Sequence, residues 1–327
     1  MQREKQSGSF SGRAVSEIQQ QTEGLDMSFG LALSGGGIRG AAHVGVLLAL
    51  EEAGMVPDSI SGASAGGIVA GLYAAGYSAH ELRGIIQELA KGGRSLLDPD
   101  YWGLIRAVPQ LISGREVRFS GFLKGNRLED YFCGLTGGKM MRDLNMLTVI
   151  PCADLTSGLT LACTSHLRGV QQMERVRWSS GLRICEVLRA TSAVPAVFRP
   201  KQIGDLCLVD GGVTDVLPVN LLIAAGEPSV LAVDVGKAYR MPEQINIWEV
   251  ATHSLSVMQE RLQEYVAHGE RMQITPRLPD HTRLLDFNMM ETCMEAGYEE
   301  TKKQMPEIKR LFSPSYPGSR RVFRTRT

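Results

Sequence analysis

A serine stands at the centre of a short glycine-rich motif that can support covalent catalysis. The motif reads Gly62-Ala63-Ser64-Ala65-Gly66 and fits the pattern G-x-S-x-G. Small neighbours allow a tight strand-to-helix turn, which would hold the Ser64 hydroxyl exposed at a helix N-terminus, where the helix dipole favours negative charge. The motif predicts Ser64 as the nucleophile of acyl transfer, with Gly62 and Gly66 forming the turn. A chance match in a Gly/Ser-rich turn is the alternative.

A second glycine-rich segment lies upstream and reads Gly35-Gly36-Gly37-Ile38-Arg39-Gly40. Acyl transfer needs backbone N–H donors for the oxyanion, and loss of one donor lowers turnover by about 10²–10³. Gly35, Gly37 and Gly40 also match the dinucleotide fingerprint G-x-G-x-x-G, which requires an acidic residue about 20 residues on, after the second strand. The serine motif occupies that place, so the oxyanion interpretation is favoured.

The candidate base is an aspartate after an apolar run. Leu206-Cys207-Leu208-Val209 leads into Asp210, which is followed by Gly211 and Gly212. A carboxylate at a strand end with two glycines behind it can project into a cleft, although Asp-Gly-Gly is also an ordinary turn sequence. A catalytic histidine is the alternative, since α/β-hydrolases carry one after the acidic residue. The histidines considered for that role are His253, His268 and His281, of which none lies in a glycine-flanked loop after a strand, and His43, which would brace the glycine segment or simply pack.

The elements that must position these residues alternate between strands and helices. Apolar runs predict strands at 29–34, 58–61, 147–153, 159–164, 207–209 and 230–235. Helical patterns cover 38–53, 65–75, 184–191, 247–268 and 291–312. This order predicts an α/β fold of three α/β/α layers with a largely parallel central sheet, and it places the catalytic residues at the carboxyl ends of strands.

One catalytic domain is expected over residues 29–312, between two tails. Residues 1–28 are polar and lack the apolar core of a signal peptide, and residues 313–327 form a basic tail. Within the domain, residues 91–142 mix apolar side chains with polar residues and prolines. This segment predicts a helical insertion that serves as a lid and touches lipid, or else an ordinary amphipathic surface helix.

The composition excludes several classes of function. Lys plus Arg and Asp plus Glu both number 35, so the net charge gives no argument for nucleic-acid binding. The six cysteines form no CxxC pair, and no His/Cys/Asp cluster has metal-ligand spacing. We therefore expect free thiols in a reducing compartment, no metal and no cofactor. The uncharged segment 59–80 is rich in Gly, Ser and Ala, which favours a buried helix over a membrane span. A cytoplasmic protein with at most peripheral membrane contact is expected.

Taken in order, the glycine segment with Arg39, the serine motif and Asp210-Gly-Gly resemble the patatin-like phospholipase family. Residues 190–200 also look like the segment that precedes the aspartate in that family, and the resemblance covers about 29–222. It implies a Ser–Asp dyad, in which Asp210 takes the Ser64 proton and later activates the water that releases the acyl-enzyme. The amides of Gly36, Gly37 and Ile38 would bind the oxyanion, and Arg39 would steady the loop or add positive potential.

The resemblance further implies a serine hydrolase that cleaves carboxylic esters of lipids: phospholipid, lysophospholipid or acylglycerol. One departure leaves substrate shape open, because bacterial members often carry Asn-Pro where this chain reads Thr214-Asp215-Val216-Leu217-Pro218. An acyltransferase or thioesterase acting on acyl-CoA is one alternative. A catalytically silent lipid-binding regulator is another, although the serine, the aspartate and the glycine segment are all present.

Overall fold

The computed structural model describes residues 28–113, 120–236, 247–265, 269–280, 282 and 284–313. Its strands are β1 (Gly30–Leu33), β2 (Ser59–Gly62), β3 (Gly121–Leu123), β4 (Leu147–Asp154), β5 (Leu159–Thr164), β6 (Val176–Ser179), β7 (Ala196–Phe198), β8 (Lys201–Ile203), β9 (Leu206–Asp210), β10 (Val230–Val233) and β11 (Met272–Ile274). Its α-helices are α2 (Ala41–Glu52), α3 (Ala65–Ala74), α4 (Ala79–Gly92), α5 (Tyr101–Ile112), α6 (Asn126–Thr136), α7 (Ile184–Thr191), α8 (Val219–Ala224), α9 (Ile247–Tyr265) and α10 (Met290–Phe312).

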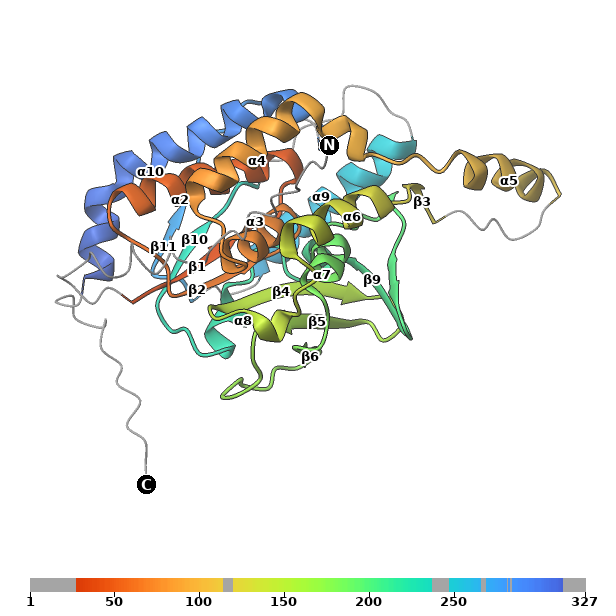
Figure 1. Cartoon of the computed structure of the whole chain (residues 1–327). Helices are drawn as coiled ribbons and strands as arrows, with labels where there is room; N and C mark the ends of the chain where they lie inside the picture. Colours follow the sequence, from red (N-terminus) through yellow and green to blue (C-terminus); the bar gives the residue numbers. More distant parts are fainter. Residues whose placement is uncertain are drawn as a thin grey trace, which may run out of the picture.

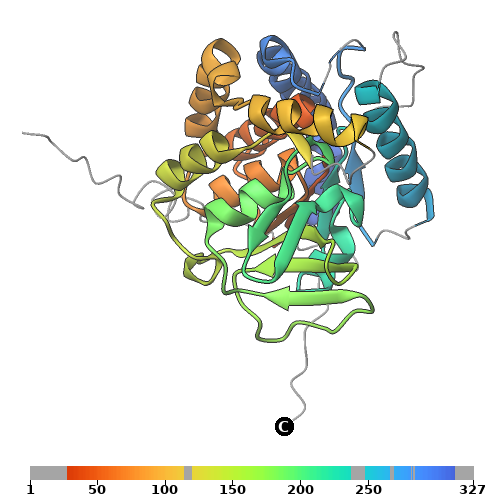
Figure 2. The ribbon, with the colours of Figure 1, turned by 90° about the vertical axis from the view of Figure 1, so that its right-hand side faces the viewer.

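The strands form a mixed central sheet in the order β11-β10-β1-β2-β4-β5-β6, with β9 paired to β4 and β8 to β9. The pairs from β11 to β4 are all parallel, whereas β4 is antiparallel to both β5 and β9. Helices flank this largely parallel sheet (Figures 1 and 2). The predicted α/β fold is thereby confirmed.

The two faces of the sheet bury different residues because side chains alternate along a strand. In β1, Leu31 and Leu33 pack in the large core beneath α2, whereas Ala32 faces the smaller core formed with α8. Helices α2, α4 and α10 lie together over the first face (Figure 1). The thicker layer therefore covers the face on which the serine helix α3 also packs.

Strand β4 has two partners in succession along one edge. Residues Leu147–Val149 pair with β2, and residues Cys152–Asp154 pair with β9, while β5 occupies the opposite edge. Because β9 runs against β2, the ends of these two strands meet beside the middle of β4. Pro151 lies at that junction.

Helix α4 was not predicted, whereas a helical insertion was expected over residues 91–142. Helix α4 begins with a capping box between Ser78 and Glu81, which satisfies two otherwise free N–H groups of its first turn. Within the segment 91–142, helix α6 packs against α7, whereas α5 projects away from the layered body (Figure 1).

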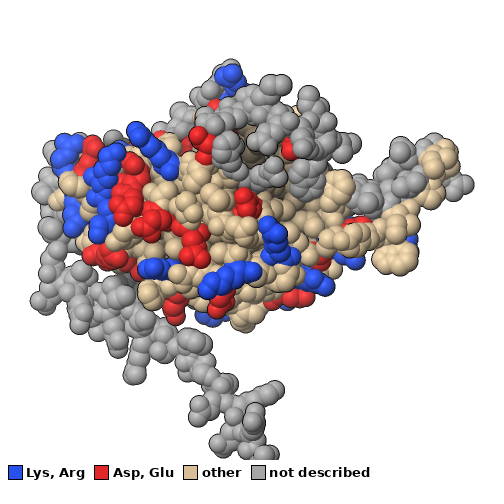
Figure 3. Space-filling view, turned by 90° about the horizontal axis from the view of Figure 1, so that it is seen from above, with Lys and Arg blue, Asp and Glu red and all other residues tan. Residues whose placement is uncertain are grey.

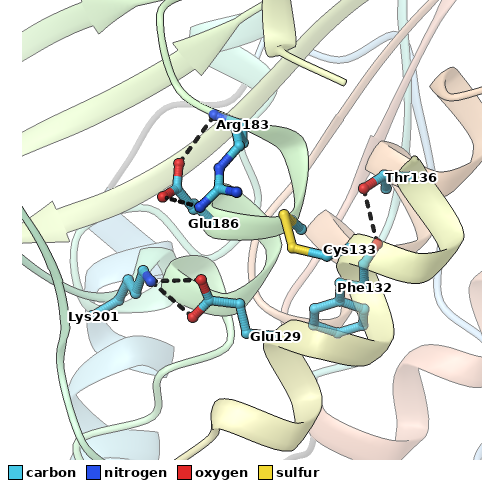
Figure 4. Close-up of a disulfide and its surroundings, with 8 residues drawn as sticks. Glu129, Phe132, Cys133, Thr136, Arg183, Glu186 and Lys201 are labelled. Carbon is cyan, nitrogen blue, oxygen red and sulfur yellow. Dashed lines mark hydrogen bonds and ion pairs between the residues drawn. A yellow bond between two sulfur atoms is a disulfide. The ribbon is translucent and has the colours of Figure 1, made fainter. Parts of the chain in front are cut away.

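The expectation of free thiols throughout is wrong for one pair of cysteines. Cys133 of α6 and Cys185 of α7 form a disulfide with Cα atoms 4.9 Å apart (Figure 4). They are 52 residues apart, so only the packing of the two helices brings them together. A salt bridge between Lys201 and Glu129 further ties α6 to β8 (Figure 4).

None of the helices in the described ranges combines the length and hydropathy required to cross a bilayer.

Candidate active site

Ser64 lies in a strained turn between β2 and α3. Its φ of 53° is unfavourable for a residue with a side chain, so surrounding contacts must hold it. The Ser64 amide donates to the Thr191 hydroxyl (3.0 Å), which in turn donates to the Pro151 carbonyl (2.7 Å). Gly66 passes so close to the Leu33 carbonyl that a side chain there would overlap it. The small residues of the motif are thus required by the tight turn.

The structure places Ser64 and Asp210 in direct contact. The Ser64 hydroxyl donates to Asp210 Oδ2 at 2.6 Å, and both residues are buried. The amide of Gly212 donates to the other carboxylate oxygen at 2.7 Å, which fixes the orientation of the group. Burial raises the pKa of Asp210 to about 6, although the hydrogen bonds from Ser64 and Gly212 oppose that rise.

The glycine segment lies next to the serine, but only some of its amides are free to bind a ligand. Its second half forms the 3₁₀ turn η1 (Gly37–Gly40). The Gly35 amide donates to the Val216 carbonyl (2.9 Å), and the Ile38 amide donates to the Leu284 carbonyl (3.2 Å). Within the described part of the chain, the amides of Gly36 and Gly37 donate to no other group.

The left-handed φ of Gly37, +59°, explains why glycine is favoured at that position. A Cβ built on Gly35 would lie 3.3 Å from the Ser64 Cβ. The segment therefore approaches the nucleophile closely, with the glycine amides Gly36 and Gly37 as its available donors.

Two basic residues lie in or near this segment: His43 is buried and Arg39 is half-buried. The His43 ring donates from Nε2 to the Ser34 carbonyl (2.9 Å), and burial lowers the pKa of His43 to about 4. Burial also lowers the pKa of Arg39, and the neighbouring Cys293 and Asp234 partly oppose this lowering. Neither residue contacts Ser64 or Asp210 through a hydrogen bond among the described residues, so His43 braces the backbone before Gly35. His253 lies in α9, and His268 and His281 lie outside the described residues.

The segment 214–218 packs beside the glycine segment. Its Val216 carbonyl accepts the Gly35 bond, and its Asp215 amide donates to Gly211 at 2.9 Å. Burial raises the pKa of Asp215 to about 7, while a hydrogen bond from the Leu217 amide opposes this. Thus the position that departs from the family pattern connects the glycine segment to the Asp210 loop.

Ser64 opens into an apolar pocket. Ile68 and Leu72, on the two turns of α3 that follow the serine, line it, together with Ile85 and Leu89 of α4. Residues from the insertion complete the wall, including Leu97 and Tyr131. Such a pocket can bury a long hydrocarbon chain beside the hydroxyl.

Two residues that hold the site carried no recognised signal in the sequence. Thr191 supports the serine turn, and it lies within the segment 190–200 that had been noted only as a family resemblance. Gln259 of α9 donates to the Gly212 carbonyl (2.9 Å), and no sequence pattern identified it. Among the described residues, no group of three His, Cys, Asp or Glu side chains could hold a metal.

Comparisons with known proteins identify the family of this chain. The family model described as patatin-like phospholipase matches residues 31–223. Uncharacterized NTE family protein Rv2565 of Mycobacterium tuberculosis is 28% identical over 212 residues, which are 65% of this chain and 31% of that protein. Patatin-like phospholipase domain-containing protein 6 of Homo sapiens is 27% identical over 298 residues, covering 83% of this chain and 20% of that protein.

Among solved structures, VipD from Legionella pneumophila is similar with a TM-score of 0.48 and 14% identity, covering 86% of this chain and 67% of that one. The chain spans less than a third of the length of the two curated relatives. The family match itself extends over more than half of the chain. The chain belongs to the patatin-like phospholipase family.

Proposed function

We propose that this protein is a serine hydrolase that cleaves carboxylic ester bonds of lipids through a Ser64–Asp210 dyad. The observation that carries the proposal is the 2.6 Å hydrogen bond from the Ser64 hydroxyl to Asp210. Membership of the family supports lipid hydrolysis as the general activity.

In the first half of the reaction, Asp210 accepts the hydroxyl proton as Ser64 Oγ attacks the ester carbonyl carbon. The resulting oxyanion is stabilised by the amides of Gly36 and Gly37. As the intermediate collapses, the alcohol leaves with the proton that Asp210 returns to it, and an acyl-serine remains. Asp210 then takes a proton from water, the hydroxide releases the fatty acid, and Ser64 regains its proton.

The environment of Asp210 suits a base that works without a histidine. Burial raises its pKa to about 6, which makes the carboxylate a better proton acceptor than a solvated aspartate while leaving it ionised at neutral pH. The bond from Gly212 leaves Oδ2 directed at the serine.

The apolar pocket supports a lipid substrate. Its walls offer Ile68, Leu72 and Leu89 to an acyl chain, and burial of each CH₂ contributes about 0.8 kcal/mol. Phospholipids, lysophospholipids and acylglycerols all carry such a chain, so the pocket favours the acyl half of the substrate and not one headgroup.

The test is hydrolysis of p-nitrophenyl esters of increasing chain length by wild type, Ser64→Ala and Asp210→Asn. We expect turnover in the wild type and its loss in both variants. Ser165→Ala and Asp154→Asn serve as matched controls, because both positions are buried and lie outside the site. Activity retained by Asp210→Asn would eliminate the dyad. Ester products formed with an added alcohol would indicate an acyltransferase, and absence of turnover would favour a lipid-binding regulator.

A further inference from the structure

Helix α5 carries the largest group of exposed apolar side chains in the described residues. Tyr101, Trp102, Ile105 and Ile112 are 67%, 68%, 58% and 82% exposed. At 3.6 residues per turn, Tyr101, Ile105 and Ile112 fall within about 40° of one another around the helix. Figure 3 shows this helix as a projection with few charged atoms, whereas charged side chains gather at the other end of that face.

The base of α5 is fixed to the body of the protein. Asp100 precedes the helix, is buried, and accepts a hydrogen bond from the Gly103 amide at its first turn. The same carboxylate pairs with Arg199, and the Asp100 amide donates to the Phe122 carbonyl (2.8 Å). The apolar face is therefore presented by an anchored helix and not by a loose end.

A polar hollow lies against the next face of α5. Arg106, Lys124 and Arg199 line it, and Asp100 is the one carboxylate among the described lining residues, so cations outnumber anions by three to one. Arg199 pairs with Asp100 through its guanidinium and is 39% exposed at its side chain, whereas no ion pair is shown for Arg106 or Lys124 in the described part of the chain. A phosphate oxygen is the kind of acceptor that these three neighbouring cations would bind.

We propose that α5 docks this protein on a lipid surface, with its Tyr101/Ile105/Ile112 face in the interface and the hollow taking an anionic phospholipid headgroup. Trp102 lies on α5 between this apolar face and the hollow. That position suits tryptophan, which is enriched at the membrane–water interface. The proposal rests on the proposed function only for the identity of the substrate, a lipid, because docking itself needs no turnover.

Continuity with the pocket supports a lipid surface as the occupant. Leu96 and Leu97, just before α5, line the apolar pocket that contains Ser64. Phe198 lines the same pocket, and its neighbour Arg199 lines the hollow. The hollow and the wall of the acyl pocket are therefore formed by neighbouring residues of the chain, and the apolar face of α5 extends beyond both.

The experiment is flotation of the full chain with vesicles of phosphatidylcholine alone or with phosphatidylglycerol added. Ser64→Ala is used as the parent, so that hydrolysis cannot change the vesicles. Ile105→Ser with Ile112→Ser should weaken binding to both vesicles by about tenfold or more. Leu155→Ser with Leu167→Ser is the matched control, since these leucines are 58% and 51% exposed elsewhere and should leave binding unchanged.

The hollow is tested separately. Arg106→Gln with Lys124→Gln should remove most of the gain in binding that phosphatidylglycerol gives, and should leave binding to phosphatidylcholine unaltered. Arg142→Gln with Lys309→Gln controls for net charge. Equal losses in both charge variants would show that bulk charge acts and would overturn the headgroup site.

Other outcomes separate this proposal from the proposed function. Docking is overturned if Ile105→Ser/Ile112→Ser floats like its parent, or if these substitutions instead convert a dimer to a monomer in light scattering. Vesicle binding that depends on α5 in a chain whose wild type hydrolyses no ester would retain docking and reject hydrolysis. Hydrolysis of a short soluble ester with vesicle binding independent of α5 would retain hydrolysis and reject docking through α5.

Discussion

The hydroxyl of Thr191 accepts a hydrogen bond from the amide of Ser64, across 127 residues of sequence. The same hydroxyl donates to the Pro151 carbonyl, so it acts as both acceptor and donor in holding the serine turn against β4. The strained φ of Ser64 is thus maintained by a side chain that does not itself contact Asp210 through a hydrogen bond among the described residues.

Thr191→Val removes this support while keeping the shape of the side chain. We expect kcat for a soluble ester to fall by about 10- to 100-fold, since a buried amide loses its partner at a cost of about 1–3 kcal/mol and the turn can relax. The control is Thr301→Val, a buried threonine whose hydroxyl donates to Gly297 in α10. Thermal unfolding should be similar in the two variants; equal kcat values would refute the role of Thr191.

Gly36→Ala tests the oxyanion segment. A Cβ at this position would lie 2.7 Å from Val235 Cγ2, so the backbone must shift away from its present place. Turnover should fall by about 10² or more, as expected when an oxyanion donor is misplaced. Gly84→Ala is the control, because no atom lies within 4 Å of the added methyl in α4. A Gly36 variant with wild-type kcat would exclude this amide from the reaction.

The pH dependence of kcat/KM should report Asp210. The base acts when ionised, and its pKa is raised to about 6, so kcat/KM should rise with pH through about 6 and then level off. His43, whose pKa is lowered to about 4, is neutral across this range. Because the pKa of Asp215 is raised to about 7, Asp215→Asn is the decisive comparison. Loss of the acidic limb in that variant would assign it to Asp215.

The same shift in pKa predicts a change in stability. Below pH 3.8 the Asp210 carboxyl is protonated in both the folded and the unfolded chain. Between pH 3.8 and about 6 the unfolded chain ionises while the buried carboxyl of the folded chain keeps its proton, which favours unfolding. The free energy of unfolding of wild type should therefore fall over this window relative to Asp210→Asn. The difference should grow by up to about 3 kcal/mol between pH 4 and pH 7. Urea unfolding at the two pH values measures it, and a constant difference would contradict the burial argument.

The pocket should set the preferred acyl length. Leu72 lies two helical turns from Ser64, about 12 Å along α3, and lines the pocket. Leu72→Phe should shift the best p-nitrophenyl ester towards shorter chains, while the rate for the acetate stays within about twofold. Leu50→Phe, at an equally buried leucine outside the pocket, should leave the preference unchanged. Unchanged preference in Leu72→Phe would place the acyl chain elsewhere.

Much of the fold could be predicted because apolar runs and glycine turns are local. The strands expected at 29–34, 58–61 and 159–164 coincide with β1, β2 and β5 within a residue or two. The direction of β9 could not be predicted, since strand pairing depends on residues far apart in sequence. The disulfide between Cys133 and Cys185 was missed for the same reason.

Prediction of the candidate site was limited in a similar way. Separate motifs indicated Ser64 and Asp210, and the structure brings them into contact. Which glycine amides stay free was not predictable, because the partners of Gly35 and Ile38 are carbonyls from residues 216 and 284. The Asp100–Arg199 pair at the start of α5 joins residues 99 apart in sequence, so the helix's own pattern could not predict it.

Strands β2 and β9 pair with the same edge of β4, so an insertion should disturb the site at some positions of this region and not at others. Ser64 follows the strand that pairs at Val149, and Asp210 ends the strand that pairs at Cys152, so the short stretch between them sets the separation of the two residues. One extra residue there would lengthen the strand by about 3.3 Å, more than the 2.6 Å hydrogen bond itself. A homologue with an insertion at Ile150 or Pro151 should therefore have lost the contact, whereas one with an enlarged turn at residues 155–158 need not.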